Sequence, residues 1–130
     1  MITSGATAAQ ISHYLHGYCP QLAAALWEAV SYGQGWSLAI VTDDDGETGH
    51  VVVRTPDGAY LDIRGLVDQA ELLADHPAAV LAHIDADWLT ARGWDLCYTE
   101  ADLAMAQAVC AAVGVSVDDD DWERAERYAL

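Results

Sequence analysis

The sequence is constrained most strongly by a Pro-Asp-Gly triplet at residues 56–58, which separates two runs of residues that favour strands. The run before it, residues 50–55, is nearly all β-branched, and the run after it, residues 59–64, contains Tyr, Leu and Ile. Pro, Asp and Gly together are typical of a tight turn. We therefore predict an antiparallel hairpin over residues 50–64.

Side chains alternate between the two faces of a strand, so the hairpin should have two different faces. One face carries only apolar side chains and is predicted to pack on the core: Val51, Val53, Leu61 and Ile63. The other face is mixed and is predicted to be functional: His50, Val52, Arg54, Tyr60, Asp62 and Arg64. Counted outward from the turn, His50 and Asp62 are not directly opposite, but a wider loop or a bulge would make them diagonal neighbours.

Helical periodicity and capping signals surround the hairpin. We predict helices over 7–16, 20–32, 99–113 and 122–128, a helical segment over 67–74, one or two helical turns over 85–92, strands over 36–42 and 79–84, and a turn at 43–46. This order predicts an α+β fold in one domain over residues 1–130, with its core at 7–84 and a helical part at 85–130.

Cys19 stands directly before Pro20 and a long run rich in Ala and Leu. Pro is favoured in the first turn of a helix because it has no N–H group to leave unpaired. Cys19 is therefore predicted at a helix N-terminus, where the positive end of the helix dipole favours a thiolate. A lone cysteine is more often a small buried hydrophobic residue, so a catalytic interpretation needs partners for the thiol.

His50 and Asp62 supply such partners. A thiol nucleophile needs a neighbouring base, and the base needs a third group that fixes its orientation. The chain offers these groups in the order Cys on a helix, His on a strand and Asp on the next strand. Asp is also disfavoured in strands, which marks Asp62 as a candidate for function. We predict that Cys19, His50 and Asp62 form a contiguous catalytic triad open to solvent.

The composition excludes several classes of protein. The chain has 5 Lys and Arg against 21 Asp and Glu, a net charge of −16, so direct binding of nucleic acid is not expected. Its 53% apolar content argues against disorder, and no apolar run is long enough for a membrane span. Three cysteines without a C-x-x-C pair, and a beginning without a secretory signal, predict a cytoplasmic protein.

The order of helix-Cys, strand-His and strand-Asp resembles the papain-like cysteine hydrolase superfamily, especially its compact NlpC/P60-like and transglutaminase-like branches. The segment from Gly49 to Gly65 and the Tyr18-Cys19 pair before an Ala/Leu helix carry this resemblance. They are also similar to small uncharacterised proteins of phages and mobile elements. The resemblance implies a Cys-bearing helix packed on a small antiparallel sheet, no cofactor, and hydrolysis of an amide or isopeptide bond in a protein or peptide-like substrate. It implies Cys19 as nucleophile, His50 as base and acid, and Asp62 as orienting group.

The neighbourhood of Cys19 departs from the papain pattern in two ways. Pro20 follows the cysteine where papain has Trp, and the few residues before it lack the Gln that completes the oxyanion hole in papain-type enzymes. His13 or His16 would take that place, beside the main-chain N–H of Cys19.

Two further interpretations are considered. The His13-x-x-His16-x-x-Cys19 spacing is compatible with metal ligation, but zinc requires further ligands from elsewhere, and we predict no metal site. The charge of −16 also suits an acidic, non-catalytic inhibitor of phage or mobile-element origin, which would block a basic nucleic-acid-binding host protein by imitating its ligand.

Overall fold

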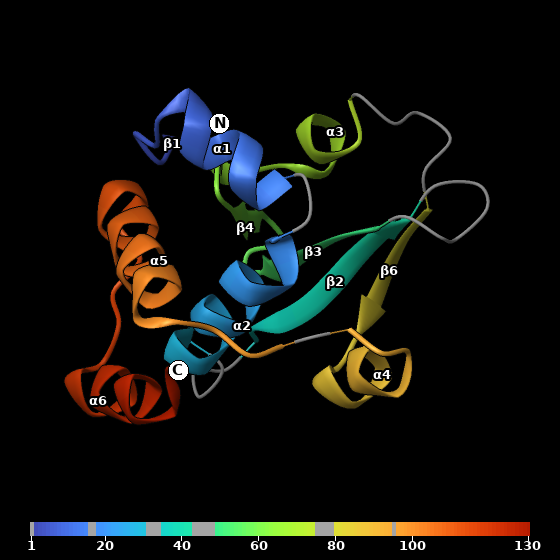
Figure 1. Cartoon of the computed structure of the whole chain (residues 1–130). Coiled ribbons are helices and arrows are strands. Elements are labelled where there is room, and N and C mark those ends of the chain that lie inside the picture. Colours follow the sequence, from blue (N-terminus) through green and yellow to red (C-terminus); the bar gives the residue numbers. More distant parts are fainter. Residues whose placement is uncertain (1, 16–17, 31–34, 43–48, 75–79, 95) are drawn as a thin grey trace.

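The structure is a computed structural model in which residues 2–15, 18–30, 35–42, 49–74, 80–94 and 96–130 are described. Within these ranges an antiparallel sheet of six strands is covered by helices, so the predicted α+β class is confirmed (Figure 1). The strands are β1 (Ile2–Thr3), β2 (Ser37–Thr42), β3 (Gly49–Arg54), β4 (Tyr60–Asp62), β5 (Gly65–Val67) and β6 (Val80–Ile84). Their order across the sheet is β1-β5-β4-β3-β2-β6.

The helices also follow the predicted order. They are α1 (Ala8–Leu15), α2 (Cys19–Val30), α3 (Gln69–Leu72), α4 (Ala86–Ala91), α5 (Glu100–Val113) and α6 (Asp119–Tyr128). Thr7 and Gln10 form a capping box at the start of α1, where each side chain accepts a hydrogen bond from the other residue's main-chain N–H. Gly114 is a left-handed C-cap that ends α5, with φ of 75°.

The hairpin is closed by a three-residue loop. The N–H of Gly58 donates to the carbonyl of Thr55 at 3.0 Å, and the N–H of Thr55 donates to the carbonyl of Ala59 at 2.9 Å. Gly58 has φ of +84°, which a glycine adopts at little cost, so this is a type I turn followed by a glycine bulge. The predicted turn at 43–46 lies outside the described residues.

The predicted core face of the hairpin is confirmed. Its four side chains join the main apolar cluster, which lies between the sheet and helices α1, α2, α5 and α6: Val51, Val53, Leu61 and Ile63. Helix α2 packs on β3, with α5 and α6 on its outer side (Figure 1). This packing places the N-terminus of α2 against the beginning of β3.

The opposite face of the hairpin is more apolar than we predicted. Val52 and Tyr60 are buried in a second cluster with Val67 and Leu72, because β5 extends the sheet beside β4 and Leu72 of α3 packs on this face. Only the two ends of the hairpin keep polar side chains here. The predicted division into one buried and one functional face is therefore wrong for the centre of the hairpin.

The segment after the hairpin also differs from the prediction. Residues 65–67 pair with β4 and with β1 and so extend the sheet, whereas helix α3 begins only after its N-cap Asp68. Two short strands, β1 and β5, were not predicted. Within the described residues, no helix combines the length and apolar character needed to cross a membrane.

Gly65 is essential to this arrangement. Its φ is +118°, and an added Cβ would overlap the carbonyl oxygen of Ile2 and lie 2.8 Å from the nitrogen of Ser4. We expect Gly65→Ala to lower the free energy of unfolding by at least about 2 kcal/mol, since it combines left-handed strain with a backbone clash. Urea unfolding followed by circular dichroism measures the change.

Gly93→Ala is the matched control, because Gly93 also has positive φ (+80°) but no atom within 4 Å of an added Cβ. It should cost only about 1 kcal/mol, from the backbone conformation alone. Equal losses for the two variants would show that β1 does not restrict Gly65.

Candidate active site

Cys19 is the first residue of α2, and Pro20 is the second. The apolar residues of this helix are buried against the sheet, and this burial holds the helix start against Gly49. The Cys19 thiol lies 3.8 Å from the carbonyl oxygen of Gly49, to which it donates a weak hydrogen bond. As a residue of the first turn, Cys19 also presents a main-chain N–H that the helix itself cannot satisfy.

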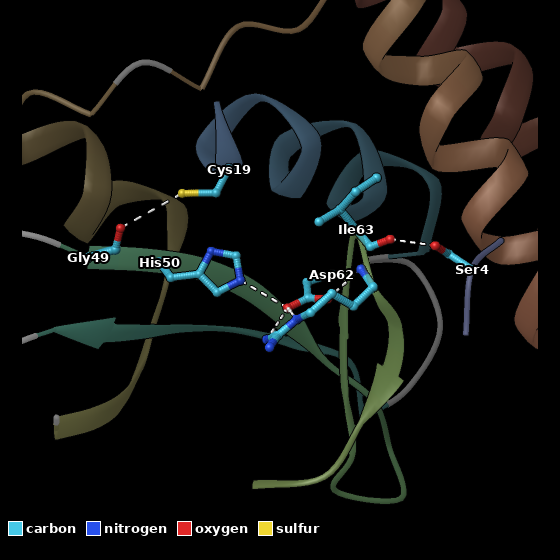
Figure 2. A network of polar contacts seen from close by, with 7 residues as sticks. Ser4, Cys19, Gly49, His50, Asp62 and Ile63 are labelled. Atoms are coloured by element: carbon cyan, nitrogen blue, oxygen red, sulfur yellow. Dashed lines mark hydrogen bonds and ion pairs between the residues drawn. The ribbon is translucent and has the colours of Figure 1, made fainter. Parts of the chain in front are cut away.

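His50 and Asp62 come together as diagonal neighbours on the hairpin. Val53 pairs with Leu61, and continuing this register places Asp62 level with Val52, two residues from His50. The wider loop at Gly58 creates this offset. The Nε2 atom of His50 lies 3.0 Å from Oδ2 of Asp62, and Figure 2 shows the ring between Asp62 and Cys19.

The tautomer of His50 follows from this contact. An ionised carboxylate only accepts hydrogen bonds, so Nε2 carries the proton that it donates to Asp62. Nδ1 is then the atom left for proton exchange with a nucleophile. It is buried and has no hydrogen bond of good geometry among the described residues.

Arg64 is a further member of the site, which the sequence showed on the same strand face but did not assign to the triad. Its Nη2 atom lies 2.7 Å from Oδ2 of Asp62, its Nε atom 3.1 Å from the same oxygen, and its main-chain N–H donates to Oδ1 at 2.8 Å. The Asp-x-Arg spacing places both side chains on one side of the chain, which is the signal that could have identified the pair. Arg64 fixes the carboxylate that orients His50.

Electrostatics favour charge on both partners of the His50–Asp62 pair. Burial lowers the pKa of His50, but the hydrogen bond and negative charge of Asp62, together with the neighbouring Cys19 sulfur, outweigh it and raise the pKa to about 9. Burial raises the pKa of Asp62, but hydrogen bonds and positive charges from His50 and Arg64 outweigh this and lower it. At neutral pH the pair is an imidazolium and a carboxylate.

The thiol is not open to solvent, which corrects our expectation of an exposed triad. Cys19 is 4% exposed, whereas the His50 side chain is 19% exposed and reaches the surface. The hollow next to the sulfur has no space for a water molecule, and its walls are side chains of α1, α2 and the hairpin: Tyr14, Leu22, Ala23, Leu26, Val51, Leu61 and Ile63. The close packing of α2 on β3 therefore brings the triad together and also closes it.

His13, one of the two proposed oxyanion donors, does not line this hollow. The ring of His13 stacks on the ring of Tyr18, with the ring centroids 4.2 Å apart, and His13 is exposed to solvent. His16 lies outside the described residues. Tyr14 does line the hollow, but its hydroxyl donates to the buried carboxylate of Asp102 at 2.7 Å. The main-chain N–H of Cys19 is the remaining candidate.

Among the described residues, no group of three His, Cys, Asp or Glu side chains could hold a metal ion. The comparisons with known proteins give no assignment, since no family model, curated protein or solved structure matches the chain. The functional argument therefore rests on the site itself.

The raised pKa of His50 predicts a specific dependence of stability on pH. Protonated His50 stabilises the fold fully below the ordinary pKa of 6.5, and this stabilisation is lost as the pH rises through about 9. We expect the free energy of unfolding to fall by roughly 2–3 kcal/mol over this interval, from the difference between the two pKa values. Urea unfolding at several pH values measures it.

Because other groups also titrate above pH 8, the test compares variants. His50→Gln should flatten the decrease, whereas His83→Gln, which changes an exposed histidine of β6, should retain the wild-type curve. A wild-type protein whose stability is constant between pH 6.5 and 9 would contradict the ion pair.

Proposed function

We propose that the chain is a papain-like thiol hydrolase that cleaves an amide or isopeptide bond with Cys19, His50 and Asp62. The observation that carries this proposal is the 3.0 Å contact between His50 Nε2 and Asp62. It leaves the other ring nitrogen for the thiol at the start of α2. A histidine used only for packing would not need a buried carboxylate that is held in turn by Arg64.

The groups fit the two steps of acyl transfer. The Cys19 thiolate attacks the carbonyl carbon, and a C–S bond forms while negative charge collects on the oxygen near the helix start. His50 Nδ1–H then gives its proton to the leaving nitrogen as the C–N bond breaks, which leaves a thioester and a free amine. Water attacks the thioester, its proton passes to Nδ1, and the C–S bond breaks to release a carboxylic acid and the thiolate.

Asp62 and Arg64 hold the histidine through this cycle. Asp62 keeps the Nε2 proton in place, so that Nδ1 is always the atom that exchanges a proton with substrate. Arg64 prevents the carboxylate from turning away. Since the hollow beside the sulfur is closed, substrate binding must separate its walls, and His50 is the member of the site that reaches the surface.

Thiol reactivity tests the proposal. In a Cys97→Ser background, which removes the exposed cysteine, a small activated ester should acylate Cys19 at pH 6, and mass spectrometry should find the acyl group on its peptide. His50→Gln should slow acylation and thioester hydrolysis by roughly 100-fold or more, because the proton-transfer group is lost. Cys19→Ala should remain folded and unlabelled.

Cys110 provides an internal control, because burial raises the pKa of its thiol to about 11 and no histidine contributes to that shift. Acylation of Cys19 at the slow rate of Cys110, or a rate that does not change in His50→Gln, would contradict the triad. Either result is expected if Cys19 is only a buried thiol that His50 does not activate.

The net charge of −16 supports a second candidate function, an acidic inhibitor that occupies the nucleic-acid site of a basic protein. Exposed carboxylates gather on α6, where Asp119, Asp120, Glu123 and Glu126 all reach solvent. This function would not use Cys19.

Competition with duplex DNA for a purified basic DNA-binding domain tests this candidate. The protein should displace DNA at about 50 mM salt and lose most of this ability at about 200 mM, as expected for binding dominated by charge. Cys19→Ala should compete equally well, whereas a triple variant, Asp119→Asn, Asp120→Asn and Glu123→Gln, should compete less. Competition that is insensitive to salt would exclude this function.

A further inference from the structure

A second cavity lies directly beside the closed hollow of Cys19. It has a volume of about 100 Å³ and is bounded by α2, α4, two strands and the segment before α5. Ten residues line it: Ala23, Ala24, Trp27, Glu28, Leu38, Val51, Ala86, Leu89, Leu96 and Tyr98. Ala23 and Val51 also line the hollow of the thiol, so the two spaces share a wall.

The cavity is apolar at its inner end and acidic near the surface. Its inner wall is made of buried residues such as Val51 and Leu89, whereas Trp27 and Glu28 are half-buried. Among the described residues that line the cavity, Glu28 carries the one carboxylate. Its negative charge acts on the neighbouring Tyr98, where burial and Glu28 together raise the pKa of the phenol to about 12.

Arg124 lies close to Glu28 but is held by other groups. It forms an ion pair with Asp121 at 3.1 Å, and it contacts Glu28 through the main-chain carbonyl, at 3.2 Å. Within the described residues, no ion pair joins the Glu28 carboxylate to a Lys, Arg or His nitrogen. Among these residues, an incoming cation would therefore meet no ion pair that it has to break.

We propose that this cavity binds the side chain of a lysine in the substrate, one residue away from the carbonyl that Cys19 attacks. The inference rests on the proposed hydrolase function. A lysine side chain has an apolar stem of four carbons and a terminal ammonium, which match the apolar inner wall and the carboxylate at the outer end. Trp27 adds an aromatic ring beside the path of the ammonium.

The size and position of the cavity agree with this ligand. An apolar cavity of roughly 150 Å³ accommodates benzene, so 100 Å³ suits four or five heavy atoms and is small for an arginine. Cys19 and Glu28 are nine residues apart on α2, about 13 Å along the helix axis. A similar length results from three parts of the bound substrate. These are the gap between sulfur and carbonyl carbon, one extended residue of about 3.5 Å, and a lysine side chain of roughly 6 Å.

Two peptide chloromethyl ketones test the inference. Both carry glycine at the reactive position, and the preceding residue is lysine in one and norleucine, its uncharged equivalent, in the other. The thiolate displaces chloride and forms a thioether, so mass spectrometry measures the rate at Cys19 in the Cys97→Ser background. We expect the lysine probe to alkylate Cys19 at least about tenfold faster, because a charge-assisted hydrogen bond discriminates the two.

Glu28→Gln should remove the difference between the probes, and Glu123→Gln, an exposed glutamate of α6, should preserve it. Ala86→Leu, which fills the cavity from α4, should slow both peptides without changing acylation by a small ester. Equal rates for lysine and norleucine in the wild-type protein would overturn the lysine site and leave the hydrolase function standing. If the small ester also fails to acylate Cys19, both proposals are overturned together.

Discussion

The buried carboxylate of Asp62 is the group on which the site depends, because a charge removed from water must be matched by donors around it. The residue is only 3% exposed, yet its two oxygens accept hydrogen bonds from His50, from the Arg64 guanidinium and from the Arg64 main chain. Each donor constrains a different part of the hairpin. Removal of any one would leave a buried negative charge incompletely compensated, which is why the end of the hairpin has one well-defined geometry.

The sheet extends this constraint to the rest of the chain. Arg64 is followed at once by Gly65, whose conformation allows β5 to pair with β1. Ser4, just beyond β1, donates its hydroxyl to the carbonyl of Ile63, and its N–H donates to the carbonyl of Arg64. The first strand of the chain therefore supports the backbone on both sides of Arg64. A change near residue 2 can disturb the orientation of His50 without touching it.

Local signals predicted the parts of this site, and tertiary contacts determined the rest. Pro20 marked the start of α2, and the triplet at 56–58 marked the hairpin, because turn and capping preferences act over a few residues. Strands β1 and β5 are two and three residues long, which is too short to show a periodicity. β1 also forms only by pairing with β5, far along the chain. The buried cluster around Tyr60 and the contact of Arg64 with Asp62 also depend on tertiary packing, which local patterns do not show. Burial of the Cys19 thiol depends on how closely α2 approaches β3, which a single sequence does not encode locally.

Because the thiol site is closed to water, the charges inside it must balance one another. Asp62 and Arg64 cancel, so a protonated His50 leaves one positive charge in a space with no room for water, beside the helix N-terminus. In the proposed mechanism a thiolate at Cys19 would balance that charge. The charge-balanced state is also the one that reacts in that mechanism, so burial need not silence the nucleophile. A substrate that separates the walls must supply binding energy, and an ammonium bound at Glu28 would provide it at the acidic surface next to that wall. Under the two proposals, the acidic character of the protein and its thiol chemistry belong to one mechanism, in which a basic substrate is attracted to the site and helps to open it.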